Sequence, residues 1–372
     1  MEMPGNLVGV GMTCRSLLLG AANAGTPVDL FTSYIDGEKP AGLYIHSVLP
    51  DFLKILPYSI SRHLTSSRLR RKFLEAIGDD EIAYLWPSTA LSVYEALAAR
   101  GVTIVSEMVN TRMAVAKPLL DSAYEGLGLE PAHGITAARI DEQNARHGLS
   151  TAIIAPSPAV ESSFVDSAYA PRIVPTSYGT WVPKVLKPRP ERFGGAPVVF
   201  LFVGRLCVRK GAHFLLEAWR NAPKGAVLRI VGEIEPAMRK LFADVLDAPN
   251  VSCAGFMHNV ALEYERADVA VLPSLEEGDP IATYEAAAHG VPIIASTAGG
   301  GRIASETGAI NIVDHLDAEC LRDRISEFAA SRDLRQNWGA AARNASLAYD
   351  WNTVAPNNIR RLYDFLDQQA GD

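Results

Sequence analysis

The sequence has few cysteines and no long apolar run. Its four thiols, Cys14, Cys207, Cys253 and Cys320, are scattered over 372 residues without metal-ligand or redox spacing, which suits a reducing cytosol. No apolar run approaches the roughly 18 residues of a membrane-spanning helix, and nothing like a secretory signal peptide opens the chain. We therefore expect a cytoplasmic protein without a metal centre.

An excess of positive charge is missing as well. The net charge of −7 shows no footprint of nucleic-acid binding, so we expect no nucleic-acid partner. The hydrophobic fraction of 48% and the charged fraction of 21% describe a soluble globular protein. A chain of this length fits two domains of moderate size.

The most informative stretch runs from Asp268 to Gly301. It contains an apolar run at 269–272, a polar turn, a ten-residue helical pattern, a Gly-Pro stop and a second apolar run at 293–296, which together predict a βαβ unit. We expect Asp279 to be the N-cap of the helix and Pro280 its first residue. Gly290 should end the helix.

Two carboxylates flank the start of this predicted helix. Glu277 and Glu285 are separated by seven residues, so both can face the crevice at the carboxyl end of the preceding strand, where open α/β sheets bind ligands. The N–H groups and the dipole of the helix start favour an anion, while carboxylates accept hydrogen bonds from sugar hydroxyls. The pattern predicts a ligand that carries both phosphate and polyol.

Another apolar run, Val198 to Val203, lies earlier in the chain and predicts the first buried strand of the second half. It leads into Gly204, Arg205 and, before the next helix, Lys210. The glycine lets the backbone approach a ligand, and the two cations lie at the carboxyl end of the strand, where they can bind an anionic group. Arg209 is an alternative to Lys210 in this role.

A glutamate, seven residues and a second glutamate at a helix start, after a strand that ends in Pro-Ser, resemble the donor-site signature of retaining glycosyltransferases of family 4 (glycosyl transferases group 1). The resemblance implies an α/β protein of the GT-B fold, with two Rossmann-like, doubly wound parallel-sheet domains across a cleft and a C-terminal helix that crosses back to the first domain. It also implies transfer of a sugar from a nucleoside diphosphate-sugar to a carbohydrate or lipid-linked acceptor hydroxyl with retention of configuration, without a required metal. Glycan, polysaccharide or glycolipid biosynthesis would be the setting.

The resemblance also implies roles for single residues. Glu285 would bind the ribose, Glu277 the donor sugar, and Arg205 and Lys210 the diphosphate. The main chain near Gly232 and Phe256, two further strand ends, would hold the nucleobase. Where relatives have Gly-Phe-Gly-Leu-Pro between the glutamates, this chain has Gly278-Asp279-Pro280-Ile281-Ala282. Gly278, Asp279 and Ile281 would contact the donor, but Pro280 has no N–H to offer.

The first half alternates strand and helix patterns, which imply a parallel sheet. Strands are expected at 28–32, 43–48, 82–86, 102–106, 152–155 and 173–175, and helices at 13–23, 90–100, 112–125, 137–147 and 159–168. A glycine-rich loop with Gly9 and Gly11 precedes the first helix, although almost no strand precedes the loop. Either the true start lies upstream or the first strand is missing. Glu107 and Asn110 follow a strand and are acceptor-side candidates, since no histidine occupies the position that relatives use.

A basic and apolar segment lies at 49–73. No acidic residue interrupts it from Arg62 to Lys72, and such segments bind anionic lipid surfaces. It would place the protein at the inner face of a membrane, whereas a solvated helix face is the simpler reading. Proline and glycine cluster at 183–195 and mark a domain boundary, which gives a first domain at 1–185, a second at 192–350 and a crossover helix at 351–372.

Two other functions use the same fold. A nucleotide-sugar epimerase needs acid and base residues around the sugar, which the sequence does not reveal. A donor-binding partner protein that has lost catalysis would fit the absent histidine. A dinucleotide dehydrogenase is disfavoured, since no G-x-G-x-x-G motif with a following acidic residue opens a βαβ unit.

Overall fold

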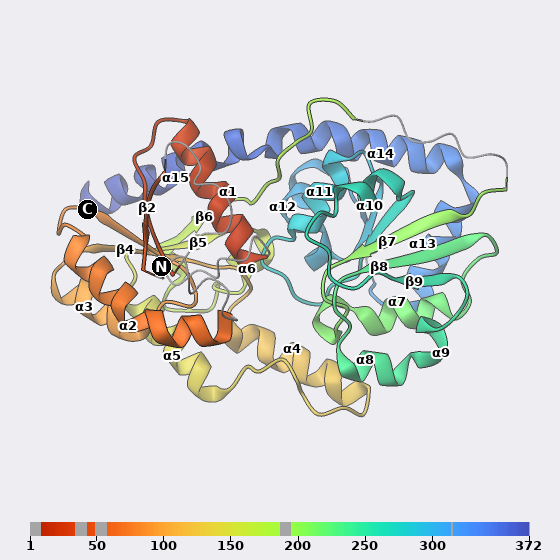
Figure 1. Cartoon of the computed structure of the whole chain (residues 1–372), viewed down its shortest axis with the longest axis horizontal. Helices are drawn as coiled ribbons and strands as arrows, with labels where there is room; N and C mark the ends of the chain where they lie inside the picture. Colours follow the sequence, from red (N-terminus) through yellow and green to blue (C-terminus); the bar gives the residue numbers. More distant parts are fainter. Residues whose placement is uncertain (1–8, 34–42, 49–57, 187–194, 314, 372) are drawn as a thin grey trace.

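The computed structural model describes residues 9–33, 43–48, 58–186, 195–313 and 315–371, with the side chains of 58–64 and 370 left aside. Figure 1 shows two α/β domains side by side, with a long helix along one edge of both. Within the described residues, no helix is long and apolar enough to cross a membrane.

The second domain has one parallel sheet of six strands in the order β12-β11-β10-β7-β8-β9. Numbered within the domain, this is the order 6-5-4-1-2-3 of dinucleotide-binding folds. The strands are β7 (Val198–Val203), β8 (Ala226–Val231), β9 (Val251–Cys253), β10 (Val269–Leu272), β11 (Ile293–Ala295) and β12 (Asn311–Ile312). The helices are α7 (Ala212–Trp219), α8 (Pro236–Leu241), α9 (Ala243–Leu246), α10 (Ala261–Arg266), α11 (Ile281–Ala288), α12 (Thr297–Thr307), α13 (Ala318–Ala330) and α14 (Arg332–Ser346).

The sequence explains this sheet. All four residues of β10 are buried, as expected for a strand covered by helices on both faces. The βαβ unit predicted at 268–301 is confirmed as β10, α11 and β11. Gly290 has φ of 65° directly after the C-cap of α11, the left-handed conformation that ends many helices.

The described strands of the first domain form two parallel sheets, β1-β2 and β3-β4-β5-β6, rather than one. The elements are α1 (Val10–Asn23), β1 (Asp29–Thr32), β2 (Tyr44–Ser47), α2 (Tyr58–Ala76), β3 (Ile82–Leu85), α3 (Leu91–Ala99), β4 (Thr103–Glu107), α4 (Met113–Gly126), α5 (Ala137–Leu149), β5 (Ala152–Ala155), α6 (Pro158–Ser162) and β6 (Ile173–Pro175). The helix predicted at 159–168 is wrong in length, because the chain turns after Ser162 and buries Phe164 against Met108 and Ile153.

The two domains share a core. Helix α15 (Trp351–Gly371) packs against α1 and β6 of the first domain, as the resemblance implied. Trp351, Val354 and Ala355 lie in one buried cluster with Cys14 and Leu17 of α1 and with Tyr284 of α11. The interdomain boundary expected at 183–195 falls largely on 187–194, which lie outside the described residues.

Candidate active site

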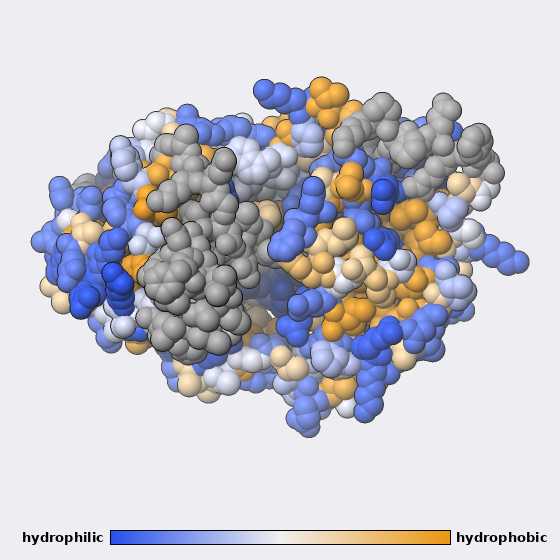
Figure 2. All heavy atoms as spheres, in the orientation of Figure 1, coloured by the Kyte–Doolittle hydropathy of each residue, from blue (hydrophilic) through white to orange (hydrophobic). Residues whose placement is uncertain are grey.

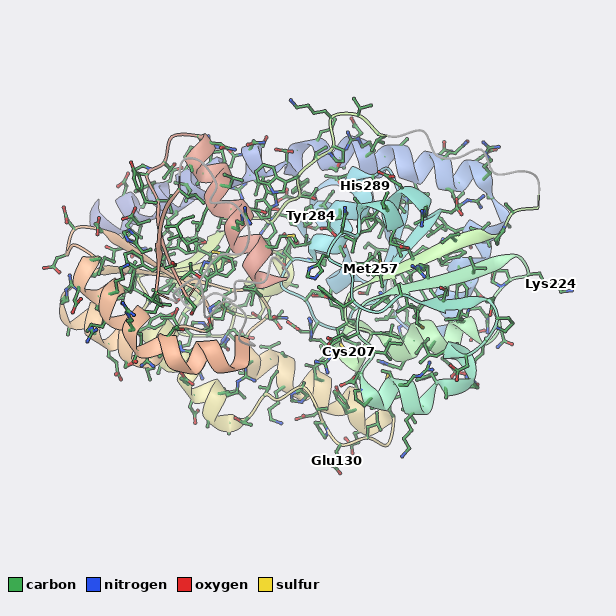
Figure 3. The ribbon with its side chains drawn as sticks, in the orientation of Figure 1. Glu130, Cys207, Lys224, Met257, Tyr284 and His289 are labelled. Carbon is green, nitrogen blue, oxygen red and sulfur yellow. The ribbon has the colours of Figure 1, made fainter. Side chains whose placement is uncertain are left out.

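A cleft of about 570 Å³ lies between the two domains. It opens at the carboxyl ends of β7 and β10, the central pair where the strand order of the second sheet reverses. Figure 3 shows Met257 on the side of the second domain that faces the first, whereas Lys224 points away from the cleft at the opposite end of the sheet. Figure 2 shows the molecule from the side seen in Figure 1. Hydrophilic residues cover much of this face, and apolar residues gather over the second domain.

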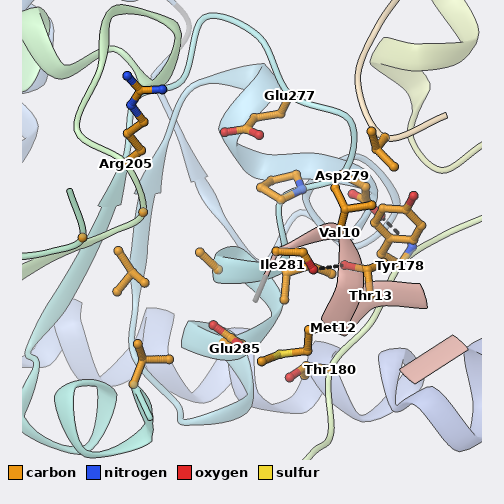
Figure 4. A pocket seen from close by; sticks show the side chains of 18 of the residues that line it. Val10, Met12, Thr13, Tyr178, Thr180, Arg205, Glu277, Asp279, Ile281 and Glu285 are labelled. Atoms are coloured by element: carbon orange, nitrogen blue, oxygen red, sulfur yellow. Dashed lines mark hydrogen bonds between the residues drawn. The ribbon is translucent and has the colours of Figure 1, made fainter. Parts of the chain in front are cut away.

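Arg205, Lys210, Glu277 and Glu285 all line this cleft, and Figure 4 shows Arg205, Glu277 and Glu285 around it. The loop after β7 supplies the two cations. Arg205 is exposed, whereas Lys210 is half-buried and ion-paired with Glu277. One wall of the cleft thus brings together two cations and two carboxylates, as predicted.

Two glycines let the backbone form this wall. Gly204 has φ of 132° and Gly232 has φ of 140°, a region that favours glycine. A Cβ on Gly232 would overlap the carbonyl oxygen of Gly204. The ends of β7 and β8 can therefore lie close together only with hydrogen at this position.

Glu277 is buried among cations. Its carboxylate pairs with Lys210, approaches Arg209 Nη1 at 3.2 Å and accepts a hydrogen bond of 2.9 Å from Ser274 Oγ. Burial alone would raise the pKa of Glu277, but the positive charges of Lys210 and Arg209 outweigh it and hold the pKa below its ordinary value. The carboxylate therefore stays ionised at neutral pH.

Glu285 has a more apolar environment. Its carboxylate accepts a hydrogen bond of 2.9 Å from the hydroxyl of Tyr264. Burial raises the pKa of Glu285 to about 7, although this hydrogen bond opposes the shift. Ile281, Phe256 and Met257 also line the cleft. Phe256 is 48% exposed, so its ring is accessible to a planar ligand.

The prediction that Asp279 caps α11 is wrong. The helix starts at Ile281 with Pro280 as N-cap, and Asp279 borders the cleft as a buried residue. Its carboxylate accepts hydrogen bonds from Tyr178 N at 2.8 Å, the Tyr284 hydroxyl at 2.7 Å and Arg302 N at 3.0 Å. These three donors outcompete the cap, and the carboxylate joins the interdomain connection to two helices of the second domain.

Three of the predicted site residues do not line the cleft. Gly11 is buried inside α1. Glu107 is 2% exposed and accepts hydrogen bonds from the hydroxyls of Tyr84 and Tyr178, so it does not face an acceptor. Gly278 lies at the interdomain contact, where a Cβ would overlap the carbonyl of Val109 and where its own carbonyl accepts from Ser157.

Gly9 and Asn110 do line the cleft on the first-domain side. Gly9 has φ of 58° and is the N-cap of α1. Residues that the sequence did not single out as binding residues lie beside them: Val10, Met12, Thr13, Ser16, Thr180 and Trp181. Trp181 donates its indole N–H to Ser16 Oγ at 3.0 Å, which fixes the ring against α1. No local motif marks these residues, because α1 and the segment at Thr180 and Trp181 are far apart in the sequence and meet only in the fold.

The part of the chain that the structure describes holds no group of three or more His, Cys, Asp or Glu residues placed to hold a metal ion. Among the described residues that line the cleft, Arg205, Arg209 and Lys210 carry the fixed positive charges that could meet an anionic ligand.

Comparison with known proteins finds similarity that is concentrated in the second domain. Residues 197–331 match the family model described as glycosyl transferases group 1. Over 194 residues, the chain is 33% identical to a GDP-mannose-dependent alpha-(1-6)-phosphatidylinositol monomannoside mannosyltransferase of Mycobacterium tuberculosis, a match that covers 47% of this chain and 48% of that protein. The chain thus spans about half the length of that relative. A D-inositol 3-phosphate glycosyltransferase of Pseudarthrobacter chlorophenolicus is 27% identical over 410 residues, covering 100% of this chain and 94% of the relative.

Solved structures share the fold along nearly the whole chain. Sucrose-phosphate synthase from Thermosynechococcus elongatus superposes with a TM-score of 0.71 at 20% identity, covering 97% of this chain and 94% of that one. HepE from Anabaena, in complex with UDP and glucose, superposes with a TM-score of 0.65 at 16% identity and 97% coverage of both chains. The chain has the GT-B fold, and its residues 197–331 match the family model of the glycosyl transferases group 1.

Proposed function

We propose that the protein is a glycosyltransferase that moves a sugar from a nucleoside diphosphate-sugar to an acceptor hydroxyl in glycan or glycolipid synthesis. The observation that carries the proposal is the single cleft wall that holds Arg205, Lys210, Glu277 and Glu285. Cations suit the diphosphate, and ionised carboxylates suit sugar and ribose hydroxyls. The names of the relatives and the UDP and glucose bound to HepE point to the same substrate class.

Arg205 and Lys210 would stabilise the negative charge that develops on the leaving diphosphate. Lys210 is held in place by Glu277, while Glu277 keeps an ionised carboxylate for hydroxyls of the donor sugar. Glu285 would accept from the ribose. We also propose that the sugar is transferred with retention of configuration, on the resemblance of the Glu277 to Glu285 motif, and the anomeric configuration of the product by NMR tests this point.

The proposal is tested by replacing each cation with alanine. Arg205→Ala and Lys210→Ala should each lower sugar transfer on the order of a hundredfold, measured with a panel of nucleoside diphosphate-sugars and acceptors. Lys224→Ala is the matched control, because Lys224 points away from the cleft. Near-normal turnover in both cleft variants would overturn the assignment, and donor turnover that needs no acceptor would instead indicate an epimerase.

We propose further that transfer needs no divalent cation, because three fixed cations already line the cleft. Transfer should then proceed at an unchanged rate in excess EDTA. A loss of activity that Mg²⁺ or Mn²⁺ restores would contradict this.

Peripheral contact with a membrane through residues 49–73 is the remaining proposal. Residues 49–57 lie outside the described residues, but Arg68, Arg71 and Lys72 are exposed on α2. Replacing these three with glutamate should abolish co-sedimentation with vesicles that contain anionic lipid, while the wild type should bind them and ignore neutral vesicles.

A further inference from the structure

Glu276 precedes the predicted donor-sugar ligand and makes contacts that no motif indicated. It is 3% exposed, although it lies in the loop between β10 and α11. Burying an ionised carboxylate is costly unless it is fully hydrogen-bonded. The partners of this carboxylate therefore show what the residue does.

Those partners come from the other domain. Glu276 Oε1 accepts hydrogen bonds from both the backbone N–H and the hydroxyl of Thr111, each at 2.8 Å. Its Oε2 accepts from Asn110 Nδ2, also at 2.8 Å. Three donors of the loop between β4 and α4 are thus held by one side chain of the second domain.

The same carboxylate also meets a cation of the cleft. Arg209 Nη1 lies 3.5 Å from Glu276 Oε2 and donates to the Glu276 carbonyl at 3.0 Å. The carbonyl of Arg209 accepts from Leu275 N at 2.9 Å, so the two loops are joined through both backbone and side chain. Arg209 and Asn110 line the cleft, and Glu276 connects them from behind its wall.

Arg209 keeps donors for a ligand. Among the described residues, it donates every side-chain hydrogen bond from Nη1. Guanidinium has five N–H donors in a rigid planar fork. A diphosphate that binds Nε and Nη2 would therefore fix the orientation of Nη1 against Glu276, because the fork moves as one unit.

We propose that Glu276 is a positioning residue that couples nucleotide binding at Arg209 to the docking of first-domain residues Asn110 and Thr111. The inference rests on the proposed function for the identity of the ligand, a nucleoside diphosphate. It assigns no chemical step to Glu276. Its effect is to hold the acceptor-side loop in place once the donor is bound.

Two variants separate the two halves of the coupling. In Glu276→Ala, all three bonds to the first-domain loop are lost, so hydrogen exchange at residues 109–112 should be roughly tenfold to a hundredfold faster in the ligand-free protein. In Glu276→Gln, the amide oxygen can still accept from Thr111, so exchange there should stay within about threefold of wild type. The neutral amide no longer attracts Arg209.

The matched control is Glu263→Gln. Glu263 is also buried and also pairs with an arginine of the second domain, Arg229, at 2.9 Å, but within the described residues it makes no hydrogen bond to the first domain. Exchange at residues 109–112 should be unchanged in this variant. Wild-type exchange in Glu276→Ala would overturn the proposal, and faster exchange in the control would show a general loss of stability.

Nucleotide then tests the coupling itself, with UDP, GDP and ADP as probes. The nucleotide that binds wild type should slow exchange at residues 109–112 about threefold or more. It should bind Glu276→Gln with a Kd within about threefold of wild type but without this slowing. Slowing retained in Glu276→Gln would overturn the coupling, as would loss of nucleotide binding. Failure of all three nucleotides to bind wild type would count against both the coupling and the proposed function, whereas the ligand-free contact would still be decided by Glu276→Ala.

Discussion

At the scale of single residues, three buried carboxyl groups among the described residues have pKa values above the ordinary range. Burial raises the pKa of Glu107 to about 8, of Glu285 to about 7 and of Asp279 to about 6, in each case against hydrogen bonds that favour the charged form. Each of these groups destabilises the folded protein when it ionises. The ionised Glu277, held by Lys210 and Arg209, is the opposite case.

Glu107 should make the folded protein less stable at alkaline pH. Because its folded pKa is above its unfolded value, its contribution to stability is fully present below about pH 4.5 and is lost as the pH rises through about 8. The loss is on the order of 5 kcal/mol at most. In Glu107→Gln, the fall in the free energy of unfolding between pH 5 and pH 9 should be reduced by a few kcal/mol, as measured by urea denaturation. Equal pH profiles of the two proteins would contradict the buried, titrating carboxyl.

Glu285 should give nucleotide binding its own pH dependence. The ionised carboxylate of Glu285 accepts hydrogen bonds from ribose hydroxyls better than the protonated carboxyl group does. The affinity for the nucleotide should therefore fall as the pH drops from 8 to 6, through the Glu285 pKa of about 7. Calorimetric titration should show this fall for a nucleotide with an intact ribose. Neither Glu285→Gln nor a 2′,3′-dideoxy nucleotide on wild type should show it. A pH-dependent Kd in Glu285→Gln would assign the effect to another group.

At the scale of elements, the loops after β7 and β10 hold each other in place. Gly211 has φ of 67° between the 3₁₀ turn Val208–Lys210 and α7, and a Cβ there would overlap the carbonyl of Pro273, directly after β10. The close approach of these two loops brings Lys210 to Glu277. Small size at position 211 is therefore a requirement of the site as well as of the turn.

Gly211→Ala should destabilise the protein more than a change of backbone preference explains. Gly225 is the control, since it has φ of 79° with nothing within 4 Å of a Cβ. Gly225→Ala should lose about 1 kcal/mol from the left-handed conformation alone, and Gly211→Ala roughly 2 to 4 kcal/mol because overpacking adds to it. Equal shifts of the melting temperature in the two variants would mean that the loop contact carries no energy.

The elements also show what sequence can predict. Apolar runs such as 198–203 and 269–272 predicted β7 and β10, because a buried parallel strand must be apolar on both faces. Asp279 was misjudged because its local pattern fits an N-cap, whereas its donors, Tyr178 N among them, lie far along the chain. Glu276 gave no signal for the same reason, since Thr111 is 165 residues away. Local chemistry predicted the second-domain wall, and the contacts between domains required the fold.

At the scale of the whole molecule, α15 packs on both domains. It follows α14 of the second domain and crosses α1 of the first (Figure 1). At the crossing, Gly20 of α1 lies so close to α15 that a Cβ would overlap the carbonyl of Trp351 and lie 2.7 Å from Ala355 Cβ. The buried cluster around this crossing includes residues of both domains: Trp86 and Tyr178 of the first, and Leu201 and Tyr284 of the second.

A large side chain at this crossing should separate the unfolding of the domains. Wild type should melt in one calorimetric transition, because unfolding either domain exposes the shared cluster. Gly20→Leu should push α15 off α1 and give two transitions, with the lower one shifted by several degrees for a cost of roughly 2 to 3 kcal/mol. Gly148→Leu is the control, since Gly148 is exposed on α5 with nothing within 4 Å of a Cβ, and it should keep one transition. If Gly20→Leu also melts once at the wild-type temperature, the crossing of α15 does not hold the domains together.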